Sequence, residues 1–151
     1  MTTTLLCLVA GTGCLDPDDP LPVVERDREG FRCDVYPVLL RDCGFPACHG
    51  NDERFFQVFG PGRTRIDGTG IFGDATDREI DATLERTRSM LDTAPPFEQS
   101  LLLRKPLDPT AGGAGHFGVD PLGRDVYASE DDPGYQALAR WARGEPSAGC
   151  P

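Results

Sequence analysis

The sequence predicts a mostly α-helical protein with one folded domain, built from short helices and long loops, with at most one short hairpin. Residues 77–91 and 132–143 each place apolar side chains on one helical face. The chain has 18 glycines and 14 prolines, a content that favours long connecting loops. Residues 1–30 differ in composition from the rest, and the remaining chain of roughly 120 residues suffices for one hydrophobic core.

Residues 1–14 are interpreted as an export signal of the lipoprotein type. The apolar run from Leu5 to Ala10 is followed by small residues and then by Cys14, which would carry the lipid after cleavage. Residues 15–30 are rich in proline and charge, as is typical of a flexible tether. These features predict the bacterial cell envelope, either periplasmic or lipid-anchored. The alternative is a disordered leader.

The charge balance predicts the kind of partner. Aspartate and glutamate number 25 against 15 lysines and arginines, which gives a net charge of −10. Such a chain should not bind nucleic acid or anionic lipid through its own surface, and it favours a basic protein partner. No stretch has the length of a membrane-spanning helix, so we expect membrane attachment only through the lipid. The sequence does not indicate the oligomeric state.

The folded domain, residues 31–151, is predicted to begin with a short helix. Val35, Val38 and Leu39 have helical spacing, and Pro37 is compatible with this helix if it lies in the first turn. The helix would lead the chain directly into Cys43.

Cys43, Cys48 and His49 form the most informative motif. Two thiols followed directly by an imidazole are typical of covalent haem c attachment, in which each thiol adds to a haem vinyl group and the histidine binds the iron. The usual spacer has two residues, whereas this chain has Gly44-Phe45-Pro46-Ala47. Two alternatives stay open. One is a local disulfide with a surface histidine, and the other is a Cys/His zinc site, which lacks further ligands nearby.

The segment from residue 54 to residue 66 is predicted to be a strand or an extended segment that ends in a tight turn at Gly60-Pro61-Gly62. Arg63 and Arg65 are interpreted as solvent-exposed, although with haem bound they could neutralise its propionates. Residues 97–104 are predicted to form a helical turn that Pro106 ends.

A glycine-rich loop, residues 111–118, carries His116, the only other histidine. Such a loop can fold tightly against a ligand. With haem on the cysteine motif, His116 is the predicted distal iron ligand. Met90 is the alternative, but its place near the end of the predicted helix 77–91 favours a core role. Two strong ligands favour electron transfer over catalysis. We therefore predict an electron carrier and no enzyme, with a peroxidase-like protein as the alternative.

The last helix, residues 132–143, has clear end signals. Asp132 is the expected N-cap, Pro133 takes the first helical position and Gly144 follows the end. Its apolar stripe should pack on the first helix. If these two helices cross, Cys33 and Cys150 could meet as a disulfide, which requires an oxidising compartment.

Together these segments resemble the small c-type cytochrome domains of bacterial envelope proteins, of the planctomycete type. The matching segments are Val35-Tyr36-Pro37-Val38-Leu39, Cys48-His49-Gly50, Leu102-Leu103-Arg104-Lys105-Pro106, Gly115-His116-Phe117-Gly118 and the helix from Tyr135 to Trp141. The C-x4-CH spacer departs from the commoner form. The resemblance implies a cytochrome c-like fold, one covalent haem c with its iron, and single-electron transfer with a redox protein partner. The alternative is a disulfide-stapled envelope binding or structural module without a cofactor.

Overall fold

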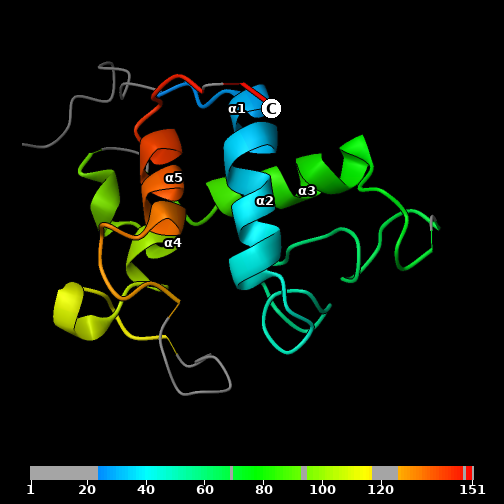
Figure 1. Cartoon of the computed structure of the whole chain (residues 1–151), viewed down its shortest axis with the longest axis horizontal. Coiled ribbons are helices and arrows are strands. Elements are labelled where there is room, and N and C mark those ends of the chain that lie inside the picture. The colour runs from blue at the N-terminus through cyan, green and yellow to red at the C-terminus, as the bar shows by residue number, and fades with distance from the viewer. Residues whose placement is uncertain (1–23, 69, 93–94, 117–125, 148, 151) are drawn as a thin grey trace, which may run out of the picture.

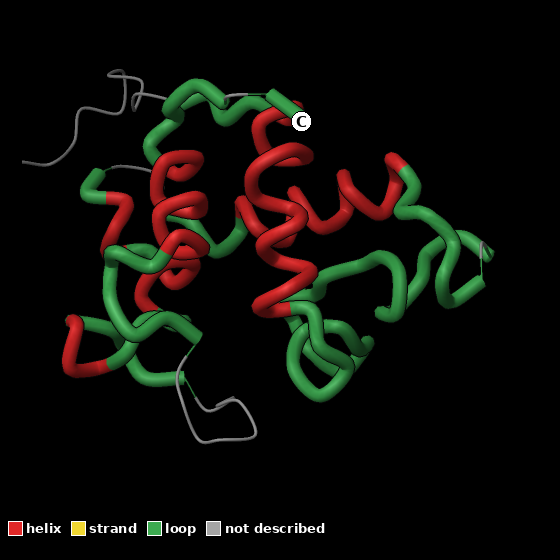
Figure 2. The backbone as a smooth tube through the Cα atoms, viewed as in Figure 1, coloured by secondary structure: helices red, strands yellow, loops and turns green. Residues whose placement is uncertain are grey.

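A computed structural model of the chain describes residues 24–68, 70–92, 95–116, 126–147, 149 and 150. Within these ranges the chain forms helices and loops and no strand, as Figure 2 shows, apart from one isolated bridge between Leu107 and Tyr127. The predicted mostly α-helical fold is confirmed. The predicted export signal with Cys14 lies outside the described residues, as does most of the tether. No helix in the described ranges is long and apolar enough to cross a bilayer.

The first helical segment runs without interruption from Arg28 to Cys43 (Figure 1). It consists of α1 (Arg28–Gly30), the π-helical turn η1 (Phe31–Val35), α2 (Tyr36–Val38) and the π-helical turn η2 (Leu39–Cys43). The Asp27 carboxylate caps its start by accepting hydrogen bonds from the amides of Glu29 and Gly30. The helix therefore begins earlier than the sequence indicated.

Residues 24–30, the described end of the predicted tether, pack against the domain. The Arg26 Nε donates a hydrogen bond of 3.0 Å to the carbonyl of Ala142. The Trp141 Nε1 donates one of 3.2 Å to the carbonyl of Asp27. Val24 packs on the hydrophobic core. These contacts with the last helix place the start of the folded domain before Phe31.

Pro37 was expected to lie in the first turn of the helix. It lies instead inside the helical segment. Proline has no N–H, and its ring crowds the carbonyl four residues earlier. The helix passes this position with a wider turn, in which the amide of Tyr36 donates to the carbonyl of Phe31, five residues earlier. The wider turn lets the helix continue to Cys43.

The other helices are α3 (Asp77–Arg88), η3 (Phe97–Gln99), α4 (Leu101–Arg104), η4 (Pro109–Ala111) and α5 (Pro133–Ala142). Of these, α3 and α5 begin where their sequence signals indicated, while η4 was not predicted. At the start of α3, Thr76 and Glu79 form a capping box, in which each side chain accepts a hydrogen bond from the backbone amide of the other residue. Asp132 caps α5 as predicted, by accepting from the amide of Gly134 at 2.8 Å.

The core lies between α5 and the first helical segment, which stand side by side (Figure 1), as predicted from the apolar stripe of α5. The Phe31 and Trp141 rings meet with centroids 5.3 Å apart. Fully buried side chains include Phe31, Val35, Leu39, Val58, Leu103 and Leu138. Their removal from water is the main stabilising contribution to this helix pair.

Residues 54–66, predicted to be a strand or an extended segment that ends in a tight turn, form a loop without a strand. The expected turn is present, because the Gly60 amide donates to the carbonyl of Thr64. The backbone beside the turn bonds elsewhere, with the Val58 amide donating to His49 at 2.8 Å and the Thr64 amide donating to Gly50 at 2.9 Å. Outside the turn, this segment therefore bonds to residues 43–50, here called the cysteine–histidine loop.

Arg65 is not the solvent-exposed residue that the sequence suggested. Its side chain is 10% exposed and forms a two-pronged ion pair with Glu79, whose side chain is 0% exposed, at 2.7 and 2.9 Å. Burial alone would raise the pKa of Glu79, but Arg65 and the amides of Thr76 and Ile66 lower it to about 2. Arg63 is also engaged, because it donates to the carbonyl of Leu40 at 2.8 Å. Both arginines are structural.

The predicted disulfide between Cys33 and Cys150 is present. It joins the first helical segment to the C-terminal segment across a sequence separation of 117 residues. The two Cα atoms lie 4.7 Å apart. The covalent link therefore holds the two ends of the described chain together.

Candidate functional site

A pocket of about 360 Å³ opens between η2, the loop after it, α4 and α5. Cys43, Cys48, His49, His116 and Met90 all line it. The fold thus brings together all five residues that the sequence analysis selected as tethers or ligands. Much of the remaining wall is apolar and consists of Leu39, Ala47, Phe56, Leu101, Leu102, Pro106, Val126 and Leu138.

The C-x4-C spacer closes into a compact loop at the end of η2. The Gly44 amide donates to the carbonyl of Leu39 at 2.8 Å, and the His49 amide donates back to the carbonyl of Cys43 at 3.1 Å. Gly50 is required, because a Cβ atom there would collide with the carbonyl oxygen of Gly44. The four-residue spacer therefore folds back on itself and leaves both cysteines and the histidine beside the pocket.

Both pocket cysteines are free thiols. The local disulfide that the sequence analysis kept as an alternative is not formed. Cys43 is buried and Cys48 is half-buried. Burial, with a smaller contribution from Asp42, raises the pKa of Cys43 to about 12, so this residue is a neutral thiol at pH 7.

His49 is held in the orientation and protonation state of a metal ligand. Its Nδ1 lies 2.9 Å from the carbonyl oxygen of Phe56. Because a carbonyl can only accept, Nδ1 carries the hydrogen and Nε2 keeps its lone pair. Burial lowers the pKa of His49, and the neighbouring His116 and Arg54 lower it further. The ring is therefore neutral at pH 7, as metal ligation requires.

The ring of His116 lies beside that of His49, with centroids 5.8 Å apart and ring planes inclined at 55°. Two hydrogen bonds anchor the loop before His116 to the end of α4. The Ala114 amide donates to the carbonyl of Arg104 at 2.8 Å, and the Lys105 Nζ donates to the carbonyl of Gly115 at 3.3 Å.

Met90 lies just beyond the end of α3, in a turn and not on the helix. The expected continuation of this helix to residue 91 is therefore wrong. The carbonyl of Met90 accepts a hydrogen bond of 3.0 Å from the Leu102 amide, which ties this turn to α4 beside the pocket. Met90 thus lines the pocket as well, together with His49 and His116.

The geometry does not assemble a closed zinc site from these residues. In the described part of the chain, no three of the pocket thiols and imidazoles have ligand atoms that all lie within 4.8 Å of one another. A tetrahedral Cys/His site needs such convergence. The pocket thus holds two thiols and two imidazoles, no three of which converge on one point in the described part of the chain.

Sequence reasoning missed the charged side chains of the pocket. Asp42, Arg54 and Lys105 line it, while Arg63 and Arg65, the candidates for pairing with haem propionates, bind backbone and Glu79 elsewhere. Lys105 stands within one of the segments that carry the family resemblance, which is the signal that could have identified it.

The chain matches no protein-family model, no curated protein and no solved structure. The class of protein is therefore defined by the fold and the pocket alone. It is a mostly helical protein whose first and last helices enclose a pocket with two thiols and two neighbouring imidazoles. What this pocket binds is argued from its chemistry.

Proposed function

We propose that the protein is a single-electron carrier of the bacterial cell envelope that binds one haem c covalently. The observation that carries this proposal is the convergence of Cys43, Cys48 and His49 on one pocket, in which the centroid of the His116 ring lies 5.8 Å from that of His49. The pocket volume of about 360 Å³ lies in the usual range for ligand sites. The set of two thiols and two imidazoles matches what covalent haem attachment and iron ligation require.

Each residue has one role in this proposal. Cys43 and Cys48 hold the porphyrin through thioether bonds, His49 is the proximal ligand and His116 the distal ligand. Lys105 is available for the acidic groups of the cofactor. When bound, the haem supplies one-electron iron chemistry. The apolar wall excludes water, and two protein ligands leave no open position for peroxide, which favours an electron carrier over a peroxidase-like enzyme.

The partner is expected to be a basic redox protein. The net charge of −10 would steer it towards this chain and would make the association rate fall as the salt concentration rises. A lipid anchor on Cys14, in the part of the chain outside the described residues, would hold the carrier at the membrane surface.

Expression of the full chain in a bacterium with haem-attachment machinery tests the proposal. The purified protein is expected to show a Soret band, and its denatured mass should exceed that of the polypeptide by one haem. The matched control is the double variant Cys43→Ser/Cys48→Ser, which should lose the added mass while keeping the Cys33–Cys150 disulfide. A colourless wild-type protein of unmodified mass would contradict the proposal.

Replacing His116 with alanine is expected to leave the haem attached and to change its absorbance spectrum to that of five-coordinate or water-ligated iron. Added imidazole should restore the wild-type spectrum, because it can occupy the vacated ligand position. Met90→Leu is the control, since leucine conserves the side-chain volume and removes only the sulfur. An unchanged spectrum of the His116 variant would reject this ligand, and a changed spectrum of the Met90 variant would assign the position to methionine.

The second candidate function is an envelope binding or structural module without a cofactor. The Cys33–Cys150 disulfide is what such a module would need, because this bond stabilises the domain without a cofactor. The same spectrum and mass measurement separates the two functions.

A further inference from the structure

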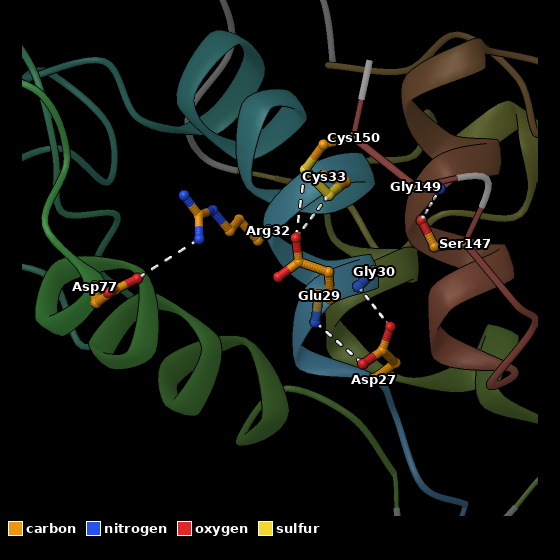
Figure 3. The surroundings of a disulfide bond; sticks show 9 residues. All are labelled: Asp27, Glu29, Gly30, Arg32, Cys33, Asp77, Ser147, Gly149 and Cys150. Carbon is orange, nitrogen blue, oxygen red and sulfur yellow. Dashed lines mark hydrogen bonds and ion pairs between the residues drawn. A yellow bond between two sulfur atoms is a disulfide. The ribbon is translucent and has the colours of Figure 1, made fainter.

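A second cluster of metal-ligating groups lies away from the pocket, at the disulfide. The Glu29 carboxylate and the sulfurs of Cys33 and Cys150 have ligand atoms that all lie within 4.8 Å of one another. Figure 3 shows the carboxylate directed at both sulfurs. Among the described residues, no other group of three or more such side chains meets this distance.

The carboxylate contacts are not hydrogen bonds in the oxidised state. The Glu29 Oε1 lies 3.6 Å from the Cys33 Sγ and 3.7 Å from the Cys150 Sγ. Disulfide sulfurs carry no hydrogen, so neither can donate a hydrogen bond to the carboxylate. An acidic side chain nevertheless lies against both sulfurs, in an arrangement that would suit three ligands of a common cation.

We propose that the reduced protein binds one Zn²⁺ ion through Glu29, Cys33 and Cys150. In a tetrahedral zinc site with Zn–S about 2.3 Å and Zn–O about 2.0–2.2 Å, a sulfur and an oxygen ligand lie roughly 3.5 Å apart. The two observed sulfur–oxygen distances already have this value to within a few tenths of an ångström. Two sulfur ligands of zinc lie roughly 3.8 Å apart, against about 2.05 Å in a disulfide, so the sulfurs need to separate by less than about 2 Å.

The positions of the three residues in the fold support this site. Glu29 and Cys33 are four residues apart in the first helical segment, where side chains with this spacing share a face. Cys150 comes from the C-terminal segment. Glu29 and Cys150 are exposed and Cys33 is half-buried, so an ion has access and water can take the fourth position. A metal here would join the same two segments that the disulfide joins.

The exchange between the two states is chemically balanced. Reduction by a dithiol breaks the S–S bond with two electrons and two protons, and the dithiol becomes a disulfide. Zn²⁺ then binds the two sulfurs as thiolates and displaces their two protons into solvent. The two segments are thus joined by the disulfide in the oxidised protein, or by a divalent cation that binds both thiolates in the reduced protein.

Zinc titration of the full-length chain tests this site. The protein is reduced with a trialkylphosphine, the reductant is removed without oxygen, and Zn²⁺ is added in competition with a chromophoric chelator. We expect the reduced chain to bind one more equivalent of Zn²⁺ than the oxidised chain. On binding it, the reduced chain should release two protons and gain thermal stability. Cys150→Ser should abolish this equivalent, and Glu29→Gln should weaken its binding about tenfold or more.

Two further variants make the assignment specific. Glu25→Gln removes a neighbouring exposed carboxylate outside the cluster and should leave the affinity unchanged. Cys43→Ser/Cys48→Ser removes the pocket thiols and should retain the equivalent. The proposal is overturned if reduction adds no zinc equivalent, if Cys150→Ser retains it, or if it depends on the pocket thiols. Because no step uses haem, these results are independent of the proposed electron transfer.

Discussion

Replacing Glu79 with alanine is expected to lower the free energy of unfolding by roughly 3–5 kcal/mol, the usual effect of removing one partner of a buried ion pair. The Glu79 side chain is 0% exposed and accepts two hydrogen bonds from the Arg65 guanidinium, with further ones from the amides of Ile66 and Thr76. Alanine would leave the buried guanidinium without its counter-charge and those amides without their acceptor. Denaturant unfolding of the two proteins measures the difference.

Glu85→Ala is the matched control on the same helix. Glu85 pairs with Arg88 at 2.9 Å, but the two side chains are 68% and 42% exposed. Exposed ion pairs contribute about 0–1 kcal/mol, so this variant should unfold close to the wild-type midpoint. A Glu79 variant that lost no more stability than the Glu85 variant would show that the buried pair makes no special contribution.

Acid unfolding gives an independent check on Glu79. Its pKa is about 2 in the folded chain, against an ordinary value of 4.5. A carboxylate whose pKa is lowered by folding stabilises the fold fully above pH 4.5, and this stabilisation is lost as the pH falls towards 2. Its size corresponds to about 3 kcal/mol. Glu79→Gln has no charge to titrate and should remove this part of the acid dependence.

The features that local signals encode could be predicted from the sequence. Helix α5 was predicted from its apolar stripe and its capping residues, Asp132, Pro133 and Gly144, and the structure places it within a residue of the predicted bounds. The cysteine–histidine loop was predicted from adjacent residues. His116 was selected by its glycine-rich surroundings alone, and the structure brings it to the same pocket.

The features that depend on distant contacts could not be predicted. Arg65 looked like a surface residue because nothing in the sequence reveals that Glu79 is buried or that the carbonyls of Gly70 and Gly73 accept hydrogen bonds from it. The absence of a strand in residues 54–66 has the same cause, since residues on both sides of the turn at Gly60 bond to the cysteine–histidine loop. These partners become adjacent only when the whole chain is folded.

Removal of the Cys33–Cys150 disulfide is expected to have the other large effect. For a loop of this length, with a sequence separation of 117 between the cysteines, the chain-entropy model gives a stabilisation of about 5 kcal/mol. The double variant Cys33→Ser/Cys150→Ser should lose most of it, because its unfolded chain regains the freedom that the bond removes. Denaturant unfolding at equilibrium, with and without haem, provides the measurement.

Reduction of the wild-type protein supplies the comparison that separates the bond from its residues. In a zinc-free buffer, the reduced wild type should unfold at the same denaturant concentration as the double serine variant, because both lack the covalent link. If the metal site at Glu29 also exists, added Zn²⁺ should stabilise the reduced wild type and leave the serine variant unchanged. A serine variant within about 1 kcal/mol of the oxidised protein would contradict the entropic argument, since the closed loop would then contribute little to the stability of this domain.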